Sequence, residues 1–549
     1  IEQKATVEVD GQQVPVGIWL LKKAGELGLV GLDVPEEYGG LGHDKTTSAR
    51  LAEACAGCAS QAATVGAHAG IGTLPIVLFG SKEQKERYLP RLATGEIVSC
   101  YALTEPGSGS DALSGNTTAV PTDDGSAFIL NGEKLYITNG GWADLAIVFA
   151  RVGDDYSGFI VDLHTPGCSR GAEEKKMGIR GSSTTSLVFQ DVRVPRENML
   201  GAPGDAARIA LNILYLGRMK LGFGCLGTSK QAIDLTIKFG KDRKQFGQPV
   251  ISFDIQKAKL ADMVTSVFAL DSLAYRTVGA IDCESAKLDK ADPKHDEKVI
   301  EVLRSFGVET SIVKVVGSET LVKVANHAIR MHGGYGFCEE YQVERIARDN
   351  VVDTIFEGTN DINRLVIFGT MVQNVFGGDL GFREYMEELH SEIREGKLQV
   401  TVGHGPLERE INRVVAAKRA VAFTVEQAII GTGKDIRVEQ QVIAAMADAL
   451  MALYSGESTV ARVHAMLAKS DRSRRGVLGA IAALAVHERC QDIRRLTLDT
   501  LAHVVPAGEL PAKRATLSAL LDETEAPVDS MSIKSLIADH AIEAGKYDL

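Results

Sequence analysis

Apolar and polar residues follow a helical period over the first hundred residues of the chain. Segments such as IWLLKKAGELGLVGL and SKEQKERYLPRLATG repeat their apolar positions at helical spacing and end at Gly or Pro. The segment TSARLAEACAGCASQAATVGAHAGIG has the same spacing, and YGGLGHD before it predicts a loop. Residues 1–98 are therefore predicted to form an N-terminal helical domain.

The pattern changes to strand alternation over residues 99–205. The run SAFILNGEKLYITNGGWADLAIVFARV alternates apolar and polar positions and is rich in β-branched residues, and GFIVDL and TSLVFQDVRVP continue it. Asn131-Gly132 is the strongest short signal for a hairpin turn, so we expect a hairpin there. This zone is predicted to be a central β-domain.

Long helical periodicity returns in residues 206–370 and again in residues 371–549. The charged stretch KLDKADPKHDEK at 287–298 predicts an exposed connection between two helices. A Gly- and charge-rich segment at 376–406 predicts a linker, and the amphipathic helices after it are expected to pack on the rest of the protein or on a second copy. The fold class is therefore α+β and mainly α.

Composition narrows the class of protein. A chain of 549 residues exceeds one hydrophobic core and predicts three or four units, with 45% hydrophobic and 24% charged residues as in ordinary globular proteins. The net charge of -12 argues against nucleic acid or an anionic membrane surface as the main partner. Local basic pockets for a phosphorylated cofactor remain compatible with it.

Eight scattered cysteines indicate a reducing compartment rather than a disulfide framework. Cys55 and Cys58 form a lone CxxC without a second Cys or His pair, which favours core packing over a metal site. No uninterrupted apolar run of 18 residues occurs, so we expect no transmembrane segment. Because the chain begins at Ile1, the lack of a visible targeting segment carries little weight.

Glu357 is the strongest single candidate for chemistry. It ends the apolar run VVDTIF, and Gly358-Thr359-Asn360 then lets the backbone turn away. Such a carboxylate loses solvation, which raises its pKa toward neutrality and suits the removal of a weakly acidic proton, for example one α to a carbonyl. A helix-terminal Glu or a surface ion pair explains the same segment, so other motifs must decide.

Two segments offer a cradle for a planar or phosphorylated ligand. The loop ALTEPGSGSDAL at 102–113 combines glycines, hydroxyls and N–H donors that can hold a phosphate or the polar edge of a flavin, although a surface turn has the same composition. In KLYITNGG, Tyr136 and Thr138 fall on one face of a predicted strand, where they could contact a planar cofactor.

Two later segments suggest further ligand contacts. In DRKQFGQPV, Arg243 stands at a predicted helix end, where it could pair with a pyrophosphate or simply be solvated. IRMHGGYGF brings Gly333 and Gly334 to a point of close backbone approach. GFGCLG at 222–227 matches GxGxxG, but it follows a helical segment, so we reject it as a dinucleotide fingerprint and expect its glycines to allow helix packing.

Taken in order, these segments resemble the acyl-CoA dehydrogenase family. ALTEPGSGSDA, NGEKLYITNGG, EKKMGIRGSSTTSLVFQDVRVPREN, HGGYGF and IFEGTNDINRL fall at family-like spacing across residues 20–370. The resemblance implies a helical domain, a β-domain and a C-terminal four-helix bundle that hold one FAD per subunit. The extra helical domain at 371–549 and the segment TVGAHAGIGTLP look most like the very-long-chain branch and its bacterial relatives, which are homodimers.

The resemblance makes Glu357 the base that removes the α-proton of an acyl-CoA while a β-hydride passes to flavin N5, giving a trans-2-enoyl-CoA in fatty acid β-oxidation. Some relatives carry their base just before an arginine in the first long helix of the bundle. Here that position is Gly217, ahead of Arg218, so the alternative base is absent. Arg218 is expected to hold the CoA portion or the Glu357 region.

The family's flavin contacts carry over to two groups of residues. One subunit is expected to supply Tyr101, Leu103, Thr104, Ser110, Tyr136, Thr138, Thr359 and Asp361. A neighbouring subunit's FAD is expected to meet Arg243, Gln245, Phe246, Arg330, Gly333 and Gly334. Many relatives have Trp at position 136, Gln at 330 and Gln or Glu at 361, and the change at 330 puts that cross-subunit contact in question.

Substrate contacts are expected at Ser110, Arg218, Phe356 and Gly358, with Ala63, Gly66 and Ala67 at the closed end of the acyl pocket. Medium-chain relatives plug that end with long polar side chains, so the small residues predict acyl chains of roughly C12–C20. Small residues that only let two helices approach closely would explain the same segment.

The expected partners are an acyl-CoA and an electron-transfer flavoprotein, with peripheral contact with a membrane left open. An acyl-CoA oxidase that uses oxygen shares this fold and base, and a fold relative with a scaffold or assembly role is a different class that the intact Glu357 argues against. The expected location is the cytoplasm if the chain is bacterial, and the mitochondrial matrix or inner-membrane surface if it is eukaryotic.

Overall fold

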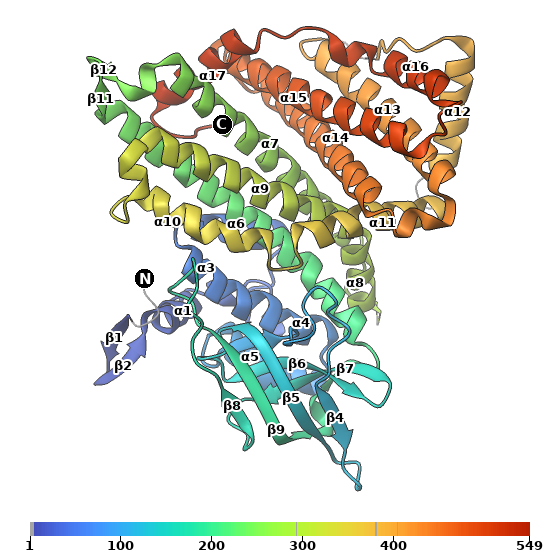
Figure 1. The fold of residues 1–549 in the computed structure, drawn as a ribbon. Helices are drawn as coiled ribbons and strands as arrows, with labels where there is room; N and C mark the ends of the chain where they lie inside the picture. Colours follow the sequence, from blue (N-terminus) through green and yellow to red (C-terminus); the bar gives the residue numbers. More distant parts are fainter. Residues whose placement is uncertain (1–4, 293, 379–380, 403–404) are drawn as a thin grey trace. The chain divides into compact units, whose positions relative to one another are not determined.

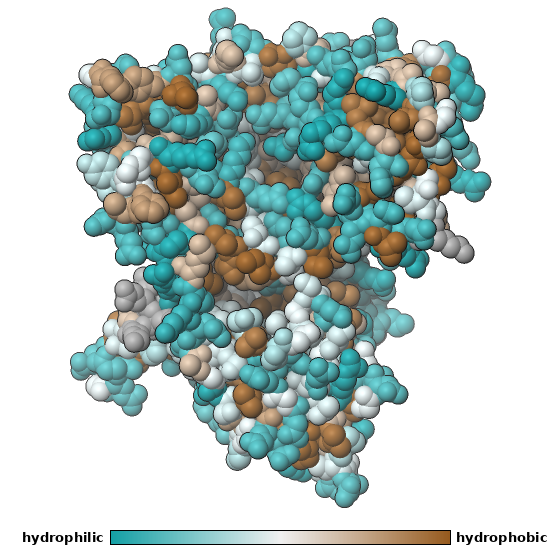
Figure 2. Space-filling model, viewed as in Figure 1, coloured by the Kyte–Doolittle hydropathy of each residue, from teal (hydrophilic) through white to brown (hydrophobic). Residues whose placement is uncertain are grey.

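The chain forms two compact units, each assembled from separate segments. The computed structural model describes residues 5–292, 294–378, 381–402 and 405–549. The first unit comprises Ile1–Thr228, Val278–Thr310 and Arg348–Glu357, and the second comprises Ser229–Thr277, Ser311–Ala347 and Gly358–Leu549. Hydrophilic and hydrophobic side chains are mixed over the visible face (Figure 2).

Helices of the first unit precede a β-domain in the chain, as the hydrophobic spacing predicts (Figure 1). They are α1 (Val16–Glu26), α2 (Lys45–Ala54), α3 (Ala59–Val65), the π-helix η4 (Gly66–Gly72), α4 (Leu74–Phe79) and α5 (Lys82–Ala93), with α8 (His295–Ser305) later in the chain. The predicted loop YGGLGHD lies outside these helices before α2, whose first turn is capped by Asp44.

A small hairpin at the start of the chain was missed by the sequence analysis. Strands β1 (Thr6–Val9) and β2 (Gln12–Pro15) pair antiparallel across Asp10-Gly11. Both turn residues have left-handed backbone, with φ of 50° and 77°, as a type I′ turn requires. The Asp-Gly dipeptide was therefore the signal that could have found it.

An eight-stranded mixed sheet forms the β-domain, and its strands fall between residues 99 and 200. Its order is β10-β7-β6-β4-β5-β9-β8, with β3 paired to β6. The strands are β3 (Ser99–Ala102), β4 (Thr118–Pro121), β5 (Ala127–Thr138), β6 (Leu145–Val152), β7 (Asp155–Asp162), β8 (Cys168–Arg170), β9 (Thr184–Pro195) and β10 (Met199–Leu200). Alternate apolar side chains such as Leu130, Phe159 and Phe189 form its core.

The predicted hairpin at Asn131-Gly132 is wrong, because both residues lie inside β5. The register of β5 against β9 shifts between Leu130 and Gly132, so the dipeptide forms a bulge rather than a turn. A Cβ at Gly132 would lie 2.5 to 2.8 Å from atoms of Thr117, which explains why glycine stands there. The turn that joins β4 to β5 is formed instead by the segment after Pro121, where Thr122 N donates to Ala127 O.

Long helices follow the sheet. They are α6 (Ala206–Asp242), α7 (Asp254–Ser285), α9 (Gly307–His332), α10 (Gln342–Asp349) and α11 (Asn360–Gly377). The predicted connection at 287–298 is confirmed up to His295, since α7 ends at Ser285 and residues 295–298 form the start of α8. The segment GFGCLG lies within α6, which confirms that it is no strand-to-helix dinucleotide loop.

Six further helices complete the second unit: α12 (Phe382–Glu395), α13 (Glu408–Thr432), α14 (Gln440–Leu467), α15 (Arg472–Val504), α16 (Leu510–Leu520) and α17 (Ser530–Ala544). α14 packs on α11, and Arg276 of α7 pairs with Glu457 of α14 at 2.8 Å. The predicted linker at 376–406 is wrong in part, because it contains α12. That helix buries Met386 and Leu389 at helical spacing.

Two helical stretches are long and apolar enough to cross a membrane by length and composition alone. They are Ala59–Phe79 and Ala206–Asp242, and 61% of each apolar window is buried inside the protein. The bent pair α11 and α12 passes the same criterion together. The expectation of no transmembrane segment therefore stays a prediction, as do the domain boundaries at residues 98, 205 and 370.

Candidate active site

Glu357 sits at a sharp, strained turn of the backbone. The 3-10 helix η8 (Asn350–Thr354) precedes it, and Glu357 and Gly358 follow with φ of 57° and 83°. A non-glycine residue in left-handed backbone costs about 1–3 kcal/mol and is kept only where its surroundings enforce it. Thr359 then caps α11, its side chain accepting from Ile362 N at 3.2 Å. The predicted turn after Glu357 is confirmed.

The main chain around this turn is held by two buried cations. Arg218, 3% exposed, donates through Nε to the carbonyl oxygen of Glu357 at 3.1 Å. Burial lowers the pKa of Arg218, and the charge of Glu357 opposes that shift. In the second unit, Lys314 donates through Nζ to Gly358 O at 2.9 Å and to Asn360 Oδ1 at 2.7 Å. Each cation thus binds one main-chain oxygen of this turn within its own unit.

Helix α6 makes room for the Glu357 carboxylate at Gly217. A Cβ at this position would lie 2.8 to 3.0 Å from the carboxylate carbon and oxygens of Glu357, closer than real Cβ atoms approach. Glycine is thus the one residue type that leaves the carboxylate where it is without a shift. Some members of the family that the sequence resembles carry their base at this position. Here the position is Gly217, which leaves room for the side chain of Glu357.

A cavity of about 190 Å³ opens beside Glu357 within the first unit. Its wall includes the predicted substrate contacts Ala63, Gly66, Ala67 and Phe356, together with Thr138. Ser110, Arg218 and Gly358, also predicted to touch substrate, are not part of this wall. Aliphatic and small side chains make up most of the remainder, so the cavity suits an apolar chain that ends beside a carboxylate.

One side of the cavity is the π-helix η4. Gly66 and Gly70 have no atom within 4 Å of an added Cβ, so their missing side chains leave the cavity wide. His68, fully buried on the same turn, accepts from Ser99 N at 3.1 Å through Nδ1 and donates to Leu92 O at 3.0 Å through Nε2. Burial lowers the pKa of His68 to about 4, so the ring is neutral near pH 7. Its two hydrogen bonds tie η4 to Ser99 and Leu92.

The opposite side of the cavity is a stripe along α6. Gly217, Leu221, Gly224 and Thr228 recur at helical spacing and all line the cavity, over about 16 Å of helix axis. Gly224 faces open space, whereas a Cβ at Gly227 would meet Glu53 O at 2.1 Å. The expectation that GFGCLG serves helix packing is confirmed at Gly227, while Gly224 widens the cavity.

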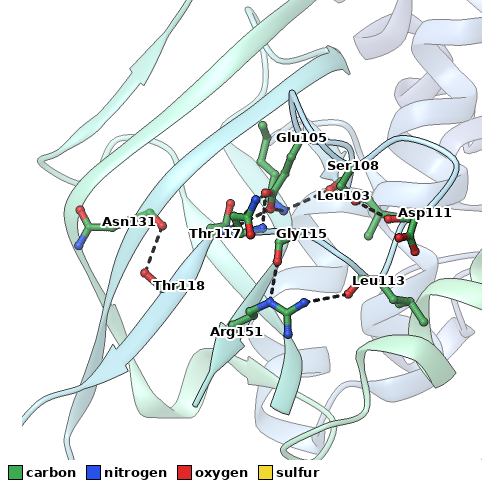
Figure 3. Close-up of polar contacts among 12 residues, drawn as sticks. Leu103, Glu105, Ser108, Asp111, Leu113, Gly115, Thr117, Thr118, Asn131 and Arg151 are labelled. Carbon is green, nitrogen blue, oxygen red and sulfur yellow. Dashed lines mark hydrogen bonds and ion pairs between the residues drawn. The ribbon is translucent and has the colours of Figure 1, made fainter. Parts of the chain in front are cut away.

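The loop after β3 is fixed by a buried ion pair (Figure 3). Lys134 Nζ lies 2.6 Å from Glu105 Oε1 and 3.2 Å from Leu103 O, and Glu105 also accepts from Asn116 N and Thr117 N. Burial lowers the pKa of Lys134 to about 8. Burial alone would raise the pKa of Glu105, but its hydrogen bond to Lys134 and the other partners outweigh it and lower that pKa. The loop is therefore preorganised.

Predicted flavin contacts of the first group surround this loop. Leu103 is buried, Thr104 is half-buried and Ser110 is exposed. Tyr136 is 62% exposed and has left-handed backbone, with φ of 59°. Tyr101 buries its hydroxyl without a hydrogen-bond partner among the described residues, and burial, with the charge of Glu357, raises its pKa well above 10. A strained, exposed aromatic face and an unsatisfied buried hydroxyl fit a planar polar cofactor.

The second group of predicted flavin contacts lies in the second unit. Arg243 precedes the hairpin of β11 (Lys244–Gln245) and β12 (Gln248–Pro249), and its guanidinium lies 5.3 Å from the Tyr335 ring centre. Phe246 forms the tip of that hairpin, 94% exposed and with φ of 51°. Exposed positions also include Gln245, Arg330, Gly333, Gly334 and Asp361, and Thr359 is half-buried. Within the chain, the Phe246 ring meets the Phe253 ring edge to face, with 6.1 Å between the ring centres.

Several residues that line the cavity were not expected from the sequence. Asp33, Ser48 and Lys220 lie in its wall, as does Cys55, which the sequence analysis assigned to core packing. Lys220 could have been found, because it follows Gly217 by three residues on one helix. No group of metal-ligating side chains occurs among the described residues, and all eight cysteines, each described, lie outside disulfides.

Comparison with known proteins agrees with this geometry. Models of the N-terminal, middle and C-terminal domains of acyl-CoA dehydrogenases match residues 2–96, 100–192 and 205–371. A probable acyl-CoA dehydrogenase of Bacillus subtilis is 41% identical over 542 residues, 98% of this chain and 91% of that protein. The human mitochondrial very long-chain specific enzyme is 37% identical over 458 residues, 78% of this chain and 67% of that protein.

Solved structures give the same result. The acyl-CoA dehydrogenase of Bacillus anthracis complexed with FAD has a TM-score of 0.94 and 39% identity, and the match covers 97% of this chain and 90% of that one. Butyryl-CoA dehydrogenase of Megasphaera elsdenii has a TM-score of 0.59 and 36% identity, and the match covers 64% and 90%. The chain belongs to the acyl-CoA dehydrogenase family and is an FAD-dependent enzyme of that family.

Proposed function

We propose that this enzyme converts long-chain acyl-CoA to trans-2-enoyl-CoA with Glu357 as the base. The observation that carries the proposal is the meeting of three features at one place. The Glu357 carboxylate lies against Gly217, its main chain is held by Arg218, and it faces an apolar cavity. A carboxylate so placed can take a proton from a chain that enters the cavity.

The role of each group follows from its position. Glu357 accepts the α-proton, and Arg218 holds the main-chain oxygen of Glu357 in its left-handed conformation. The loop pinned by Glu105 and Lys134 presents Leu103, Thr104 and Ser110 to the cofactor, and Tyr136 and Thr138 present an aromatic face and a hydroxyl. FAD supplies the acceptor for the hydride that leaves the β-carbon.

The length of the cavity supports a long acyl chain. Its wall follows α6 for about 16 Å, close to half of the roughly 30 Å that two opposed lipid chains span in a bilayer. Ala63, Gly66, Ala67 and Gly70 leave the far side without a bulky side chain. Each added methylene that is buried contributes about 0.8 kcal/mol, which favours chains of roughly C12–C20. The likeness to very long-chain specific enzymes points the same way.

We propose an electron-transfer flavoprotein as the electron acceptor. The matched relatives are named as dehydrogenases, and one similar structure is described as the electron-transferring flavoprotein of Acidaminococcus fermentans, at 34% identity and a TM-score of 0.58. An oxidase is the second candidate, because the prolyl acyl carrier protein oxidase AnaB shares the fold at 29% identity and a TM-score of 0.59. The acceptor therefore needs a direct test.

We further propose a homodimer in which each chain contributes to its partner's FAD site. Arg243, Gln245 and Phe246 on the exposed hairpin are the residues that would make the contact, with Gly333 and Gly334. Eight cysteines outside disulfides favour a reducing compartment such as a bacterial cytoplasm. Gel filtration with light scattering and cell fractionation test the two proposals.

The deciding experiment is turnover of acyl-CoAs from C4 to C20, measured with an electron-transfer flavoprotein and again with oxygen alone. We expect the highest kcat/KM at roughly C12–C20 and slow reaction with oxygen, by the methylene argument above. An optimum at butyryl- or hexanoyl-CoA would contradict the long-chain proposal. Rapid turnover with oxygen alone would make the protein an oxidase.

A further inference from the structure

Polar side chains interrupt the apolar wall of the cavity, and the proposed reaction uses none of them. Asp33, Ser48 and Lys220 line the cavity, and Lys45 joins them from the start of α2. Lys45 Nζ lies 2.7 Å from Asp33 Oδ1, while Lys220 Nζ and Ser48 Oγ both donate to Asp33 Oδ2 at 2.6 Å. These four residues are called the Asp33 cluster below.

The Asp33 cluster contains two ammonium groups and one carboxylate, so one positive charge is left over within it. Lys45 and Ser48 already donate to the two oxygens of Asp33, and Lys45 alone balances its charge. An ammonium group has three N–H donors, yet Asp33 is the one acceptor for Lys220 within the described part of the chain. Lys220 is 16% exposed along its side chain and lies in the cavity wall. It therefore has hydrogen-bonding capacity left for a ligand.

Lys220 also lies at a defined distance from Gly217 along the axis of α6. It follows Gly217 by three residues on α6, which places its Cα about 4.5 Å further along the helix axis on a neighbouring face. Gly217 abuts the Glu357 carboxylate, so an acyl chain that runs from there along α6 would pass Lys220 a few carbons beyond the carbon that Glu357 would deprotonate.

A plain hydrocarbon chain and a hydroxylated one meet this wall differently. The hydrocarbon displaces water from the ammonium donors and offers no acceptor in return, whereas a hydroxyl oxygen replaces the lost hydrogen bond. Two other carboxylates, Asp353 and Glu357, line the same cavity. Their negative charge disfavours a second carboxylate on the acyl chain, so a neutral oxygen is the better ligand.

We propose that the Asp33 cluster is a polar subsite for a hydroxyl oxygen on the acyl chain, and that the enzyme prefers acyl-CoA substrates that carry one at the matching depth. This inference rests on the proposed function, because it assumes that the cavity holds the acyl group. Lys220 is the specificity-determining residue, and Asp33 is a positioning residue that orients its ammonium group.

The wild-type holoenzyme provides the first test. The kcat/KM of ω-hydroxyacyl-CoAs is measured against that of plain acyl-CoAs of equal length, from about six to about twelve carbons. We expect the ratio to peak near tenfold at one length and to fall on both sides, since a donor left unsatisfied costs about that factor. A ratio at or below one at every length overturns the proposal. A larger peak with α,ω-dicarboxylyl-CoAs overturns the assignment to a neutral oxygen.

Variants provide the second test. Lys220→Met is expected to flatten the peak, while Lys238→Met, at an exposed lysine further along α6, keeps it. If Lys220→Met fails to fold, Lys220→Gln, which keeps a donor without the charge, is expected to lower the peak in part. A peak that survives Lys220→Met overturns the subsite.

The outcomes separate this inference from the proposed function. If the enzyme oxidises none of the acyl-CoAs in either series, the proposed function fails. If it oxidises plain acyl-CoAs and shows no peak, the subsite alone fails.

Discussion

Among the carboxylates that line the cavity, Glu357 and Asp33 have different surroundings. Asp33 accepts from two lysines and a serine, and although burial raises its pKa, the charges and hydrogen bonds of Lys220 and Lys45 hold it far below the usual range. The guanidinium near Glu357 binds its main-chain oxygen, and Gly217 leaves space beside its carboxylate. The partners of Asp33 therefore keep it in its charged form, which makes Asp33 a poor candidate for a base although it lines the cavity.

Replacing Glu357 should have the largest effect. Glu357→Gln keeps the shape but cannot accept the α-proton, so activity is expected to fall by at least ~10³-fold, in the upper part of the usual range for losing a general base. Steady-state turnover and the visible flavin spectrum measure activity and FAD content together. Near-normal turnover in a variant that retains yellow FAD would remove Glu357 from the role of base.

Replacing Asp33 should instead affect stability. Asp33→Asn leaves two ammonium groups without their carboxylate, and breaking a buried ion pair costs about 3–5 kcal/mol. Because the lysines are 16% and 18% exposed, we expect the lower end of that range. Denaturant unfolding measures the loss, and Lys23→Gln, at an exposed pair, is the control. Equal stability of Asp33→Asn and wild type would show that the two carboxylates differ less than their contacts imply.

Gly217 and Gly224 lie on the same helix, but only Gly217 abuts the Glu357 carboxylate. Gly217→Ala pushes a Cβ into the Glu357 carboxylate, and a displacement near 1 Å can reduce turnover by about 10²-fold. Gly224→Ala is the matched control, since it adds the same methyl group to the same helix in open space. The two variants are compared by kcat on one acyl-CoA. If both lose activity equally, helix effects rather than the carboxylate are responsible.

The smallest expected effect is a change of chain-length preference. Ala67→Glu adds a long polar side chain to the cavity wall, and the optimum should move toward shorter acyl chains, each lost buried methylene costing about 0.8 kcal/mol. Turnover profiles over the C4–C20 series measure the shift. An unchanged profile would mean that the chain passes along α6 and does not reach Ala67.

Two dipeptides show where local patterns succeed and fail. Asp10-Gly11 and Asn131-Gly132 carry the same type of hairpin signal, yet only the first forms a turn. At Asn131-Gly132 the strand continues as a bulge. β9 pairs with β5 on both sides of this point, and Thr117 packs directly against Gly132. Propensity was overruled by neighbours in the sheet. Helix α12 was not predicted, because its many charged residues outnumber the two apolar residues, Met386 and Leu389, that it buries.

The sequence by itself determined the helical and strand zones, the family, and Glu357 as the candidate base, because hydrophobic period and motif spacing are local properties of the chain. Only the tertiary structure brought Gly217 against the Glu357 carboxylate, though 140 positions separate them in the chain. It also gathered Asp33, Ser48 and Lys220 into the wall of one cavity. Such groupings depend on which helices pack together, and no short segment of sequence contains that information.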